Sequence, residues 1–169
     1  MSLQKSHEAV KNARHEVDIT VVAENIRTPE NLGMILRVAE AFGVRKIYFV
    51  GIKGVNFTTK AKRAARNTHT LNNFEFLDEG VALLRTMKKK DAEVVALEIT
   101  STSLAIDQAH FNFHKPIVFL IGSEREGISE PLLQLADQAV HIKMYGSNSS
   151  INVTNALSIA LHQLLLKSA

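Results

Sequence analysis

The sequence predicts an α/β domain in which helices cover both faces of a mostly parallel β-sheet. Apolar, β-branched runs alternate along the chain with stretches of helical period. Most of these runs are continuously apolar, which is typical of strands that are covered on both faces. The chain has 169 residues and contains no internal repeat or Pro/Gly/Ser-rich linker, so we expect one domain over residues 1–169.

The expected elements follow one another in strand–helix order. The strands are expected at residues 17–23, 44–50, 92–97, 117–121 and 139–142. The helices are expected at residues 29–42, 59–66, 78–90, 130–136 and 151–167, after a short leading helix near residues 3–15, within about the first 16 residues. In such folds ligands bind beyond the carboxyl ends of the strands, so the loops that follow strands are the candidate sites.

Composition excludes several function classes. The hydrophobic fraction of 46% and the charged fraction of 22% are those of ordinary folded proteins. The chain has no cysteine, which excludes thiolate nucleophiles and disulfide scaffolds and favours a reducing cytoplasm. We expect a cytoplasmic protein without a signal peptide or membrane span, because no apolar segment is long enough for either.

The loop before the first helix combines a well-made helix start with an unusual glycine. Thr28 is a good N-cap residue, and Pro29 suits the first helical position. Gly33 costs about 1 kcal/mol relative to alanine in a helix, so we expect another group to approach that face closely. Arg37 lies one turn further along the same face. The alternative is that Gly33 packs against a strand while Arg37 points into solvent.

Residues 121–129 place two glycines around three charged residues. Gly122 and Gly127 are spaced as in a phosphate-binding loop, but Ile128 and Ser129 replace the required Lys and Ser/Thr. The chain also has no G-x-G-x-x-G, so ATP and NAD are disfavoured as ligands. The carboxylate of Glu124 can accept from hydroxyl groups or orient a guanidinium. A plain exposed turn is the alternative.

Residues 142–156 are rich in hydroxyl and amide side chains. We expect Ser150 to cap the last helix, and Asn152 and Asn155 share one face of it. That helix is apolar on more than one side, which predicts contacts both with the sheet and with a second subunit.

Together these three segments resemble the SpoU/TrmH branch of the SPOUT class of RNA methyltransferases. The likeness covers nearly the whole chain, with motifs at residues 25–37, 119–129 and 142–156 in the family's order. The resemblance implies a C-terminal deep trefoil knot, a homodimer, and S-adenosylmethionine as the cofactor. It also implies methyl transfer to a ribose 2′-hydroxyl of RNA.

The resemblance assigns roles to particular residues of this chain. The catalytic candidates are Asn31, Arg37, Glu124, Ser150 and Asn152. The cofactor-binding candidates are Leu97, Gly122, Ile142, Met144, Ser150 and Ile151. Glu124 would hold Arg37 or Asn31 in place. We expect Arg37 to anchor a phosphate rather than act as a base, because the pKa of a guanidinium lies above about 12.

The expected RNA-binding residues are basic. They are Arg27 and a group within residues 52–73, a stretch that contains no Asp or Glu, namely Lys60, Lys62, Arg63 and Arg66. A solvated helix face is the alternative for that group. No metal site is expected, because His110 and His114 are four residues apart but lack a third ligand.

The RNA partner is expected to be tRNA rather than rRNA, because family members that act on rRNA often carry an extra N-terminal RNA-binding domain. Two other functions remain open. One is a non-catalytic RNA-binding relative, and the other is a nucleotide-binding α/β regulatory domain. Preferential binding of S-adenosylmethionine over ATP or NAD would argue against the regulatory domain.

Overall fold

The computed structural model describes residues 11–52, 57–66, 68–70 and 73–168. Seven strands form one sheet within this part of the chain, and every strand pair is parallel. Their bounds are β1 (Ile19–Glu24), β2 (Lys46–Val50), β3 (Phe74–Leu77), β4 (Glu93–Leu97), β5 (Leu104–Ala105), β6 (Ile117–Ile121) and β7 (Gln138–His141). The α/β class predicted from the sequence is therefore confirmed.

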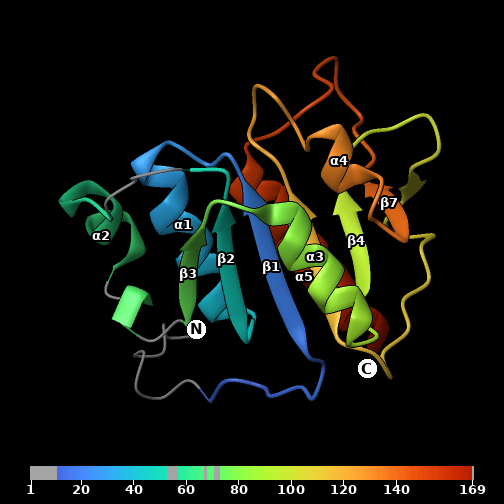
Figure 1. The fold of residues 1–169 in the computed structure, drawn as a ribbon, viewed down its shortest axis with the longest axis horizontal. Coiled ribbons are helices and arrows are strands. Elements are labelled where there is room, and N and C mark those ends of the chain that lie inside the picture. The colour runs from blue at the N-terminus through green and yellow to red at the C-terminus, as the bar shows by residue number, and fades with distance from the viewer. Residues whose placement is uncertain (1–10, 53–56, 67, 71–72, 169) are drawn as a thin grey trace, which may run out of the picture.

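The sheet has the strand order β3-β2-β1-β6-β4-β7-β5 (Figure 1). The helices are α1 (Pro29–Ala41), α2 (Thr59–Ala65), α3 (Gly80–Lys89), α4 (Glu130–Leu133) and α5 (Val153–Ser168), with a short 3-10 turn at Thr68–Thr70. Strand β6 lies between β1 and β4, which are distant from each other in the sequence. Because all strands run the same way, the loops that follow these three strands meet at one edge.

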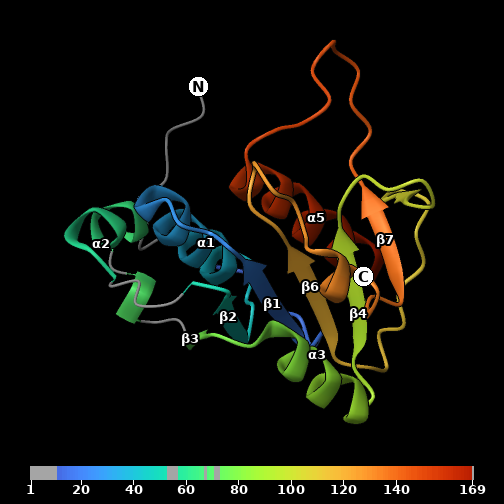
Figure 2. The ribbon, with the colours of Figure 1, turned by 45° about the horizontal axis from the view of Figure 1, so that its top comes forward.

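Two apolar clusters hold the helices against the two faces of the sheet. Successive residues of a strand point to opposite faces. In β1, Ile19 and Val21 pack in the cluster that contains α1 and α5, whereas Val22 packs in the cluster that contains α3 and α4. Figures 1 and 2 show α3 and α5 on opposite sides of the strands. This arrangement explains the continuously apolar strands.

The structure departs from the expected elements in a few places. It contains β3 and β5, two short edge strands that the sequence pattern does not predict. Helix α4 ends at Leu133, earlier than expected. Residues 11–18 have no regular secondary structure, so the expected leading helix does not extend into them, and its earlier part lies outside the described residues. No helix in the described part is long and apolar enough to cross a membrane.

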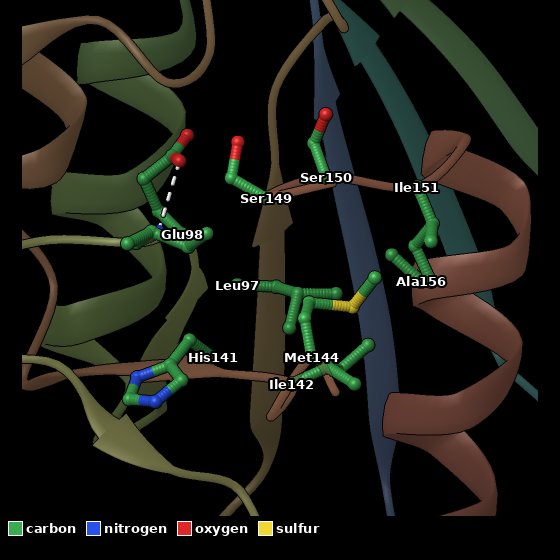
Figure 3. Close-up of a pocket in the computed structure, with 10 residues that line it drawn as sticks. Leu97, Glu98, His141, Ile142, Met144, Ser149, Ser150, Ile151 and Ala156 are labelled. Atoms are coloured by element: carbon green, nitrogen blue, oxygen red, sulfur yellow. Dashed lines mark hydrogen bonds between the residues drawn. The ribbon is translucent and has the colours of Figure 1, made fainter. Parts of the chain in front are cut away.

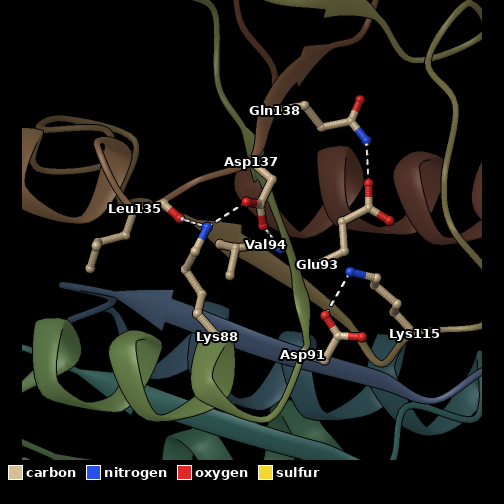
Figure 4. Close-up of polar contacts among 8 residues, drawn as sticks. All are labelled: Lys88, Asp91, Glu93, Val94, Lys115, Leu135, Asp137 and Gln138. Atoms are coloured by element: carbon tan, nitrogen blue, oxygen red, sulfur yellow. Dashed lines mark hydrogen bonds and ion pairs between the residues drawn. The ribbon is translucent and has the colours of Figure 1, made fainter.

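Polar contacts join the amino-terminal half of β4 to its surroundings (Figure 4). Lys88, at the end of α3, forms an ion pair with Asp137 and donates to the carbonyl oxygen of Leu135 at 3.0 Å. Asp137 in turn accepts from the backbone N–H of Val94 at 2.8 Å. These contacts lie at the opposite end of β4 from the loops described next. They hold α3, β4 and the start of β7 together.

Candidate active site

Three loops meet beyond the carboxyl ends of β1, β6 and β7. The first loop (residues 25–28) follows β1, the second loop (residues 122–129) follows β6, and the third loop (residues 142–152) follows β7. The third loop projects beyond the sheet before it enters α5 (Figure 2). The first loop turns sharply at once, because Asn25 has a φ of 55°, in the left-handed region. Functional sites often contain such backbone conformations.

Three predicted catalytic side chains form a hydrogen-bonded network across the loops. The Nδ2 atom of Asn31, on α1, donates to Oε1 of Glu124 at 2.5 Å. Nδ2 of Asn152 donates to the same oxygen at 3.0 Å and to Oδ1 of Asn31 at 3.1 Å. Of the two partners considered for Glu124, the structure therefore shows Asn31. Residues from the three motifs converge on one carboxylate oxygen.

The network holds Asn152 firmly. Its Oδ1 accepts from the backbone N–H of Thr154 at 2.9 Å and from the hydroxyl of the same residue. Asn152, not Ser150, is therefore the residue whose side chain caps α5, because it directly precedes the first helical residue. Thr28 likewise stands at the N-cap of α1 but makes no capping bond. Its hydroxyl instead accepts from Nδ2 of Asn31 at 2.9 Å.

Only one carboxylate oxygen of Glu124, Oε1, accepts hydrogen bonds from Asn31 and Asn152. Oε1 accepts two amide N–H groups, and Oε2 has no hydrogen-bond partner among the residues that the structure describes. The side chain is exposed. A carboxylate whose position is fixed through one oxygen can accept a ligand hydroxyl or ammonium group with the other.

The predicted cofactor-binding residues line two adjoining cavities. One cavity is lined by Leu97, Ile142, Met144, Ser150 and Ile151, among others (Figure 3). The second measures about 410 Å³ and is lined by Gly122 and the rest of the second loop, and again by Leu97, Ser150 and Ile151. Ala156, at the start of α5, borders both cavities. The structure thus brings together every residue of the predicted cofactor set.

Two carboxylates that the sequence reasoning missed hold the second loop from either side. Glu98, directly after β4, accepts from the backbone N–H of Ile128 at 3.1 Å. Glu24, the last residue of β1, accepts from the N–H and the hydroxyl of Ser129, both at 2.7 Å. Glu98 also lines both cavities. Their positions at strand carboxyl ends are the sequence signal that could have found them.

Other predicted site residues lie apart from the network. Arg37 is half-buried on α1, lines none of these cavities, and makes no side-chain hydrogen bond or ion pair within the described part of the chain. Ser150 borders both cavities but takes no part in the network. Arg27 is exposed in the first loop, beside Glu124 in a further cavity.

The basic group lies on and beside α2. Lys62, Arg63 and Arg66 are exposed. Lys60 forms an ion pair with Glu30 of α1 at 2.5 Å, and the hydrogen bond from Lys60 lowers the pKa of the Glu30 carboxyl. The positive charge of Lys60 is therefore partly offset by a carboxylate from outside the acid-free stretch.

A family model covers most of the chain. The model of the SpoU rRNA Methylase family matches residues 18–162, which include all three loops and the network. The chain belongs to the SpoU rRNA Methylase family. This membership confirms the class predicted from the sequence, an RNA 2′-O-methyltransferase that uses S-adenosylmethionine, and it does not support the non-catalytic alternatives.

Known members of this family have similar sequences and folds. A tRNA (guanosine(18)-2′-O)-methyltransferase from Thermus thermophilus is 32% identical over 161 residues, which cover 89% of this chain and 75% of the relative. The crystal structure of the Aquifex aeolicus TrmH/SpoU tRNA modifying enzyme has a TM-score of 0.77 at 27% identity, covering 88% of this chain and 74% of that one.

A third match is the AdoMet-bound rRNA methyltransferase from Sinorhizobium meliloti, with a TM-score of 0.82 at 25% identity. It covers 90% of this chain but 57% of that chain. This SpoU-family chain thus spans less than two thirds of that relative. These matches establish the fold around the network.

Proposed function

We propose that this SpoU-family chain transfers a methyl group to a ribose 2′-hydroxyl of tRNA. The observation that carries the proposal is the network of Asn31, Glu124 and Asn152 beside cavities lined by all the predicted cofactor-binding residues. Methyl transfer to a weakly acidic hydroxyl depends mainly on alignment and on control of nearby charge. A fixed carboxylate at a cavity wall supports both requirements.

The cavity linings fit S-adenosylmethionine. Leu97, Ile142 and Ile151 offer apolar surface for an adenine ring, and Glu98 and Ser150 offer polar groups for hydroxyl or ammonium groups. When bound, this cofactor supplies an electrophilic methyl group on a sulfonium sulfur. The chain's own residues would hold it and align the ribose against it.

In this proposal the network side chains position the ribose. Asn31 and Asn152 hold Oε1 of Glu124, which leaves Oε2 to accept the hydroxyl proton. The ribose oxygen would bond to the methyl carbon as the bond from that carbon to sulfur breaks, which would leave a neutral thioether. Ser150 would orient the cofactor or the ribose. Arg37 would anchor an RNA phosphate, because a guanidinium stays protonated near neutral pH.

We infer tRNA as the substrate from the relatives, since the Thermus and Aquifex proteins are named as tRNA enzymes. rRNA is the other outcome, because the Sinorhizobium relative is named as an rRNA methyltransferase. Arg27, Lys62, Arg63 and Arg66 are exposed cations that suit contacts with RNA phosphates. Acting on such RNAs would place the enzyme in the cytoplasm.

The proposal also includes a homodimer and a C-terminal trefoil knot. Ile159 and Leu166 lie seven residues apart on α5, and their large apolar side chains are 43% and 58% exposed. A second copy of the chain would cover them in a homodimer. The resemblance to the family also supports a C-terminal trefoil knot and a single catalytic domain.

The decisive experiment is methyl transfer from labelled S-adenosylmethionine. The purified protein would be incubated with separated tRNA and rRNA, and the modified nucleotide would be mapped and analysed for ribose methylation. Label in a 2′-O-methylated nucleotide of tRNA is expected. Label only in rRNA would show that rRNA, not tRNA, is the substrate. Label on a base would overturn the proposed reaction.

A further inference from the structure

A third cavity lies on the other side of the second loop from the cofactor cavities. It measures about 380 Å³, close to the 410 Å³ of its neighbour. Residues 123–126 line both cavities, so this segment separates them. Both volumes fall in the range of small-ligand sites, roughly 300 to 1,000 Å³. A methyltransferase needs two binding sites that meet at a common boundary, and the fixed carboxylate of Glu124 borders both.

The two cavities differ in chemistry. The cofactor side has aliphatic side chains such as Ile121, Ile128 and Val153. The third cavity has none of these, and Pro29 is its main apolar side chain. The first turn of α1 opens onto it through Thr28 and Pro29, and the amino end of a helix favours an anionic ligand.

Two guanidinium groups line the third cavity from facing loops. Arg27 comes from the first loop and Arg125 from the second. Both are exposed, and neither forms an ion pair or a side-chain hydrogen bond among the described residues. By contrast, Lys60, Lys88 and Lys143 each pair with a carboxylate. The cavity also contains Glu126 and Glu124, but Oε1 of Glu124 already faces two amide groups.

We propose that the third cavity binds a backbone phosphate of the RNA beside the reacting ribose, with Arg125 and Arg27 as the contacts. This inference rests on the proposed function and makes Arg125 a substrate-binding residue. An arginine fork binds phosphate oxygens in two directions, which a lysine cannot do. The RNA then approaches Glu124 from the first-loop side, while the cofactor occupies the opposite side of residues 123–126.

The test compares Arg125→Ala and Arg27→Ala with Arg85→Ala. Arg85 is an exposed arginine on α3, against the other face of the sheet, and it has no ion pair or side-chain hydrogen bond with any residue that the structure describes. It therefore controls for the loss of one positive charge. The measurements are the KM and kcat for a tRNA transcript, the Kd for S-adenosylmethionine, and the Kd for the transcript over a series of salt concentrations.

Each cavity variant is expected to raise the KM for tRNA about tenfold. Arg27→Ala is also expected to change the cofactor Kd less than twofold, because Arg27 lines the third cavity and neither cofactor cavity. Each lost phosphate contact should also flatten the slope of log affinity against log salt by about 0.7 to 0.9. Arg125→Lys should restore little. If Arg125→Ala and Arg27→Ala both behave like Arg85→Ala, the inference is wrong.

Different results would contradict the proposed methyl transfer to tRNA and the proposed phosphate site. If the wild-type protein methylates tRNA while Arg125→Ala and Arg27→Ala match the control, the proposed function stands and the phosphate site falls. If the wild-type protein methylates no tRNA but binds the transcript with a salt slope that both variants flatten, the phosphate site stands and the proposed substrate falls.

Discussion

Gly33 of α1 faces the carbonyl oxygen of Ala61 in α2 so closely that a Cβ atom on Gly33 would lie 2.2 Å from that oxygen. The backbone N–H of Ala65 would lie 2.8 Å away. The expectation that a group approaches Gly33 closely is therefore confirmed, and that group is the backbone of a helix rather than a strand. This contact sets the position of α2, and with it Lys62 and Arg63, relative to α1.

Replacing Gly33 with alanine should destabilise the protein despite the better helix propensity of alanine. The new methyl group meets backbone, which cannot rotate away, and overpacking of this kind costs about 1 to 3 kcal/mol. We expect Tm to fall by about 5 °C in a thermal melt. Gly146→Ala is the control, because nothing lies within 4 Å of that Cβ position. Equal Tm values for Gly33→Ala and Gly146→Ala would contradict the close packing at Gly33.

Glu124→Gln should impair catalysis without unfolding the site. Glutamine keeps an oxygen that can accept from Asn31 and Asn152 but removes the negative charge at Oε2. We expect kcat to fall by about 100-fold or more, with an unchanged Tm and a cofactor Kd within a few-fold. Glu126→Gln, two residues along the same loop, should change kcat much less. Normal turnover by Glu124→Gln would remove the carboxylate from the mechanism.

Arg37→Ala should abolish methyl transfer and leave cofactor affinity within a few-fold. The reason is that Arg37 lies outside the cavities that the cofactor-binding residues line, so its loss should affect RNA rather than S-adenosylmethionine. Arg37→Lys should rescue little, because an ammonium lacks the planar fork. Single-turnover assays and cofactor titration measure the two effects. Turnover near that of the wild type would show that Arg37 is dispensable.

Lys62→Ala with Arg63→Ala should weaken RNA binding at low salt. If both residues contact phosphates, the slope of log affinity against log salt should flatten by roughly 1.4 to 1.8. Arg66 is left intact because it holds a left-handed conformation, with a φ of 46°, at the end of α2. Lys89→Ala with Lys90→Ala removes the same charge at the end of α3 and serves as the control. If the two double variants have equal slopes, Lys62 and Arg63 lie on a solvated helix face that does not contact RNA.

Ile159→Glu with Leu166→Glu should convert the proposed dimer into a folded monomer. These side chains are 43% and 58% exposed in the single chain, whereas Leu161 is fully buried and would report on the core instead. Light scattering after gel filtration measures the mass, and circular dichroism checks the fold. A folded variant with the mass of the wild type would place the interface elsewhere, and a monomeric wild type would contradict the dimer itself.

The central part of the fold could be predicted because its signal is local. The strands β1, β2, β4 and β6 contain apolar residues that are buried on both faces of the sheet, and such runs can be recognised one at a time. The edge strand β5 contains two residues, Leu104 and Ala105, and exists only because it pairs with β7. A segment that short has no periodicity of its own, so the sequence pattern could not predict it.

The sequence by itself determined the fold class and the positions of the three loops, because both depend on residue type and spacing along the chain. The family resemblance of its motifs pointed to the residues that line the two adjoining cavities. Only the tertiary structure decided that Glu124 binds Asn31 and Asn152, and that Lys60 pairs with Glu30. It also decided that Glu98 and Glu24 hold the second loop. These contacts join residues far apart in the sequence, mostly where the order β1-β6-β4 places distant loops at one edge of the sheet. Hydrogen bonds are short-range and directional, so their partners are set by the packing of the strands rather than by the local pattern.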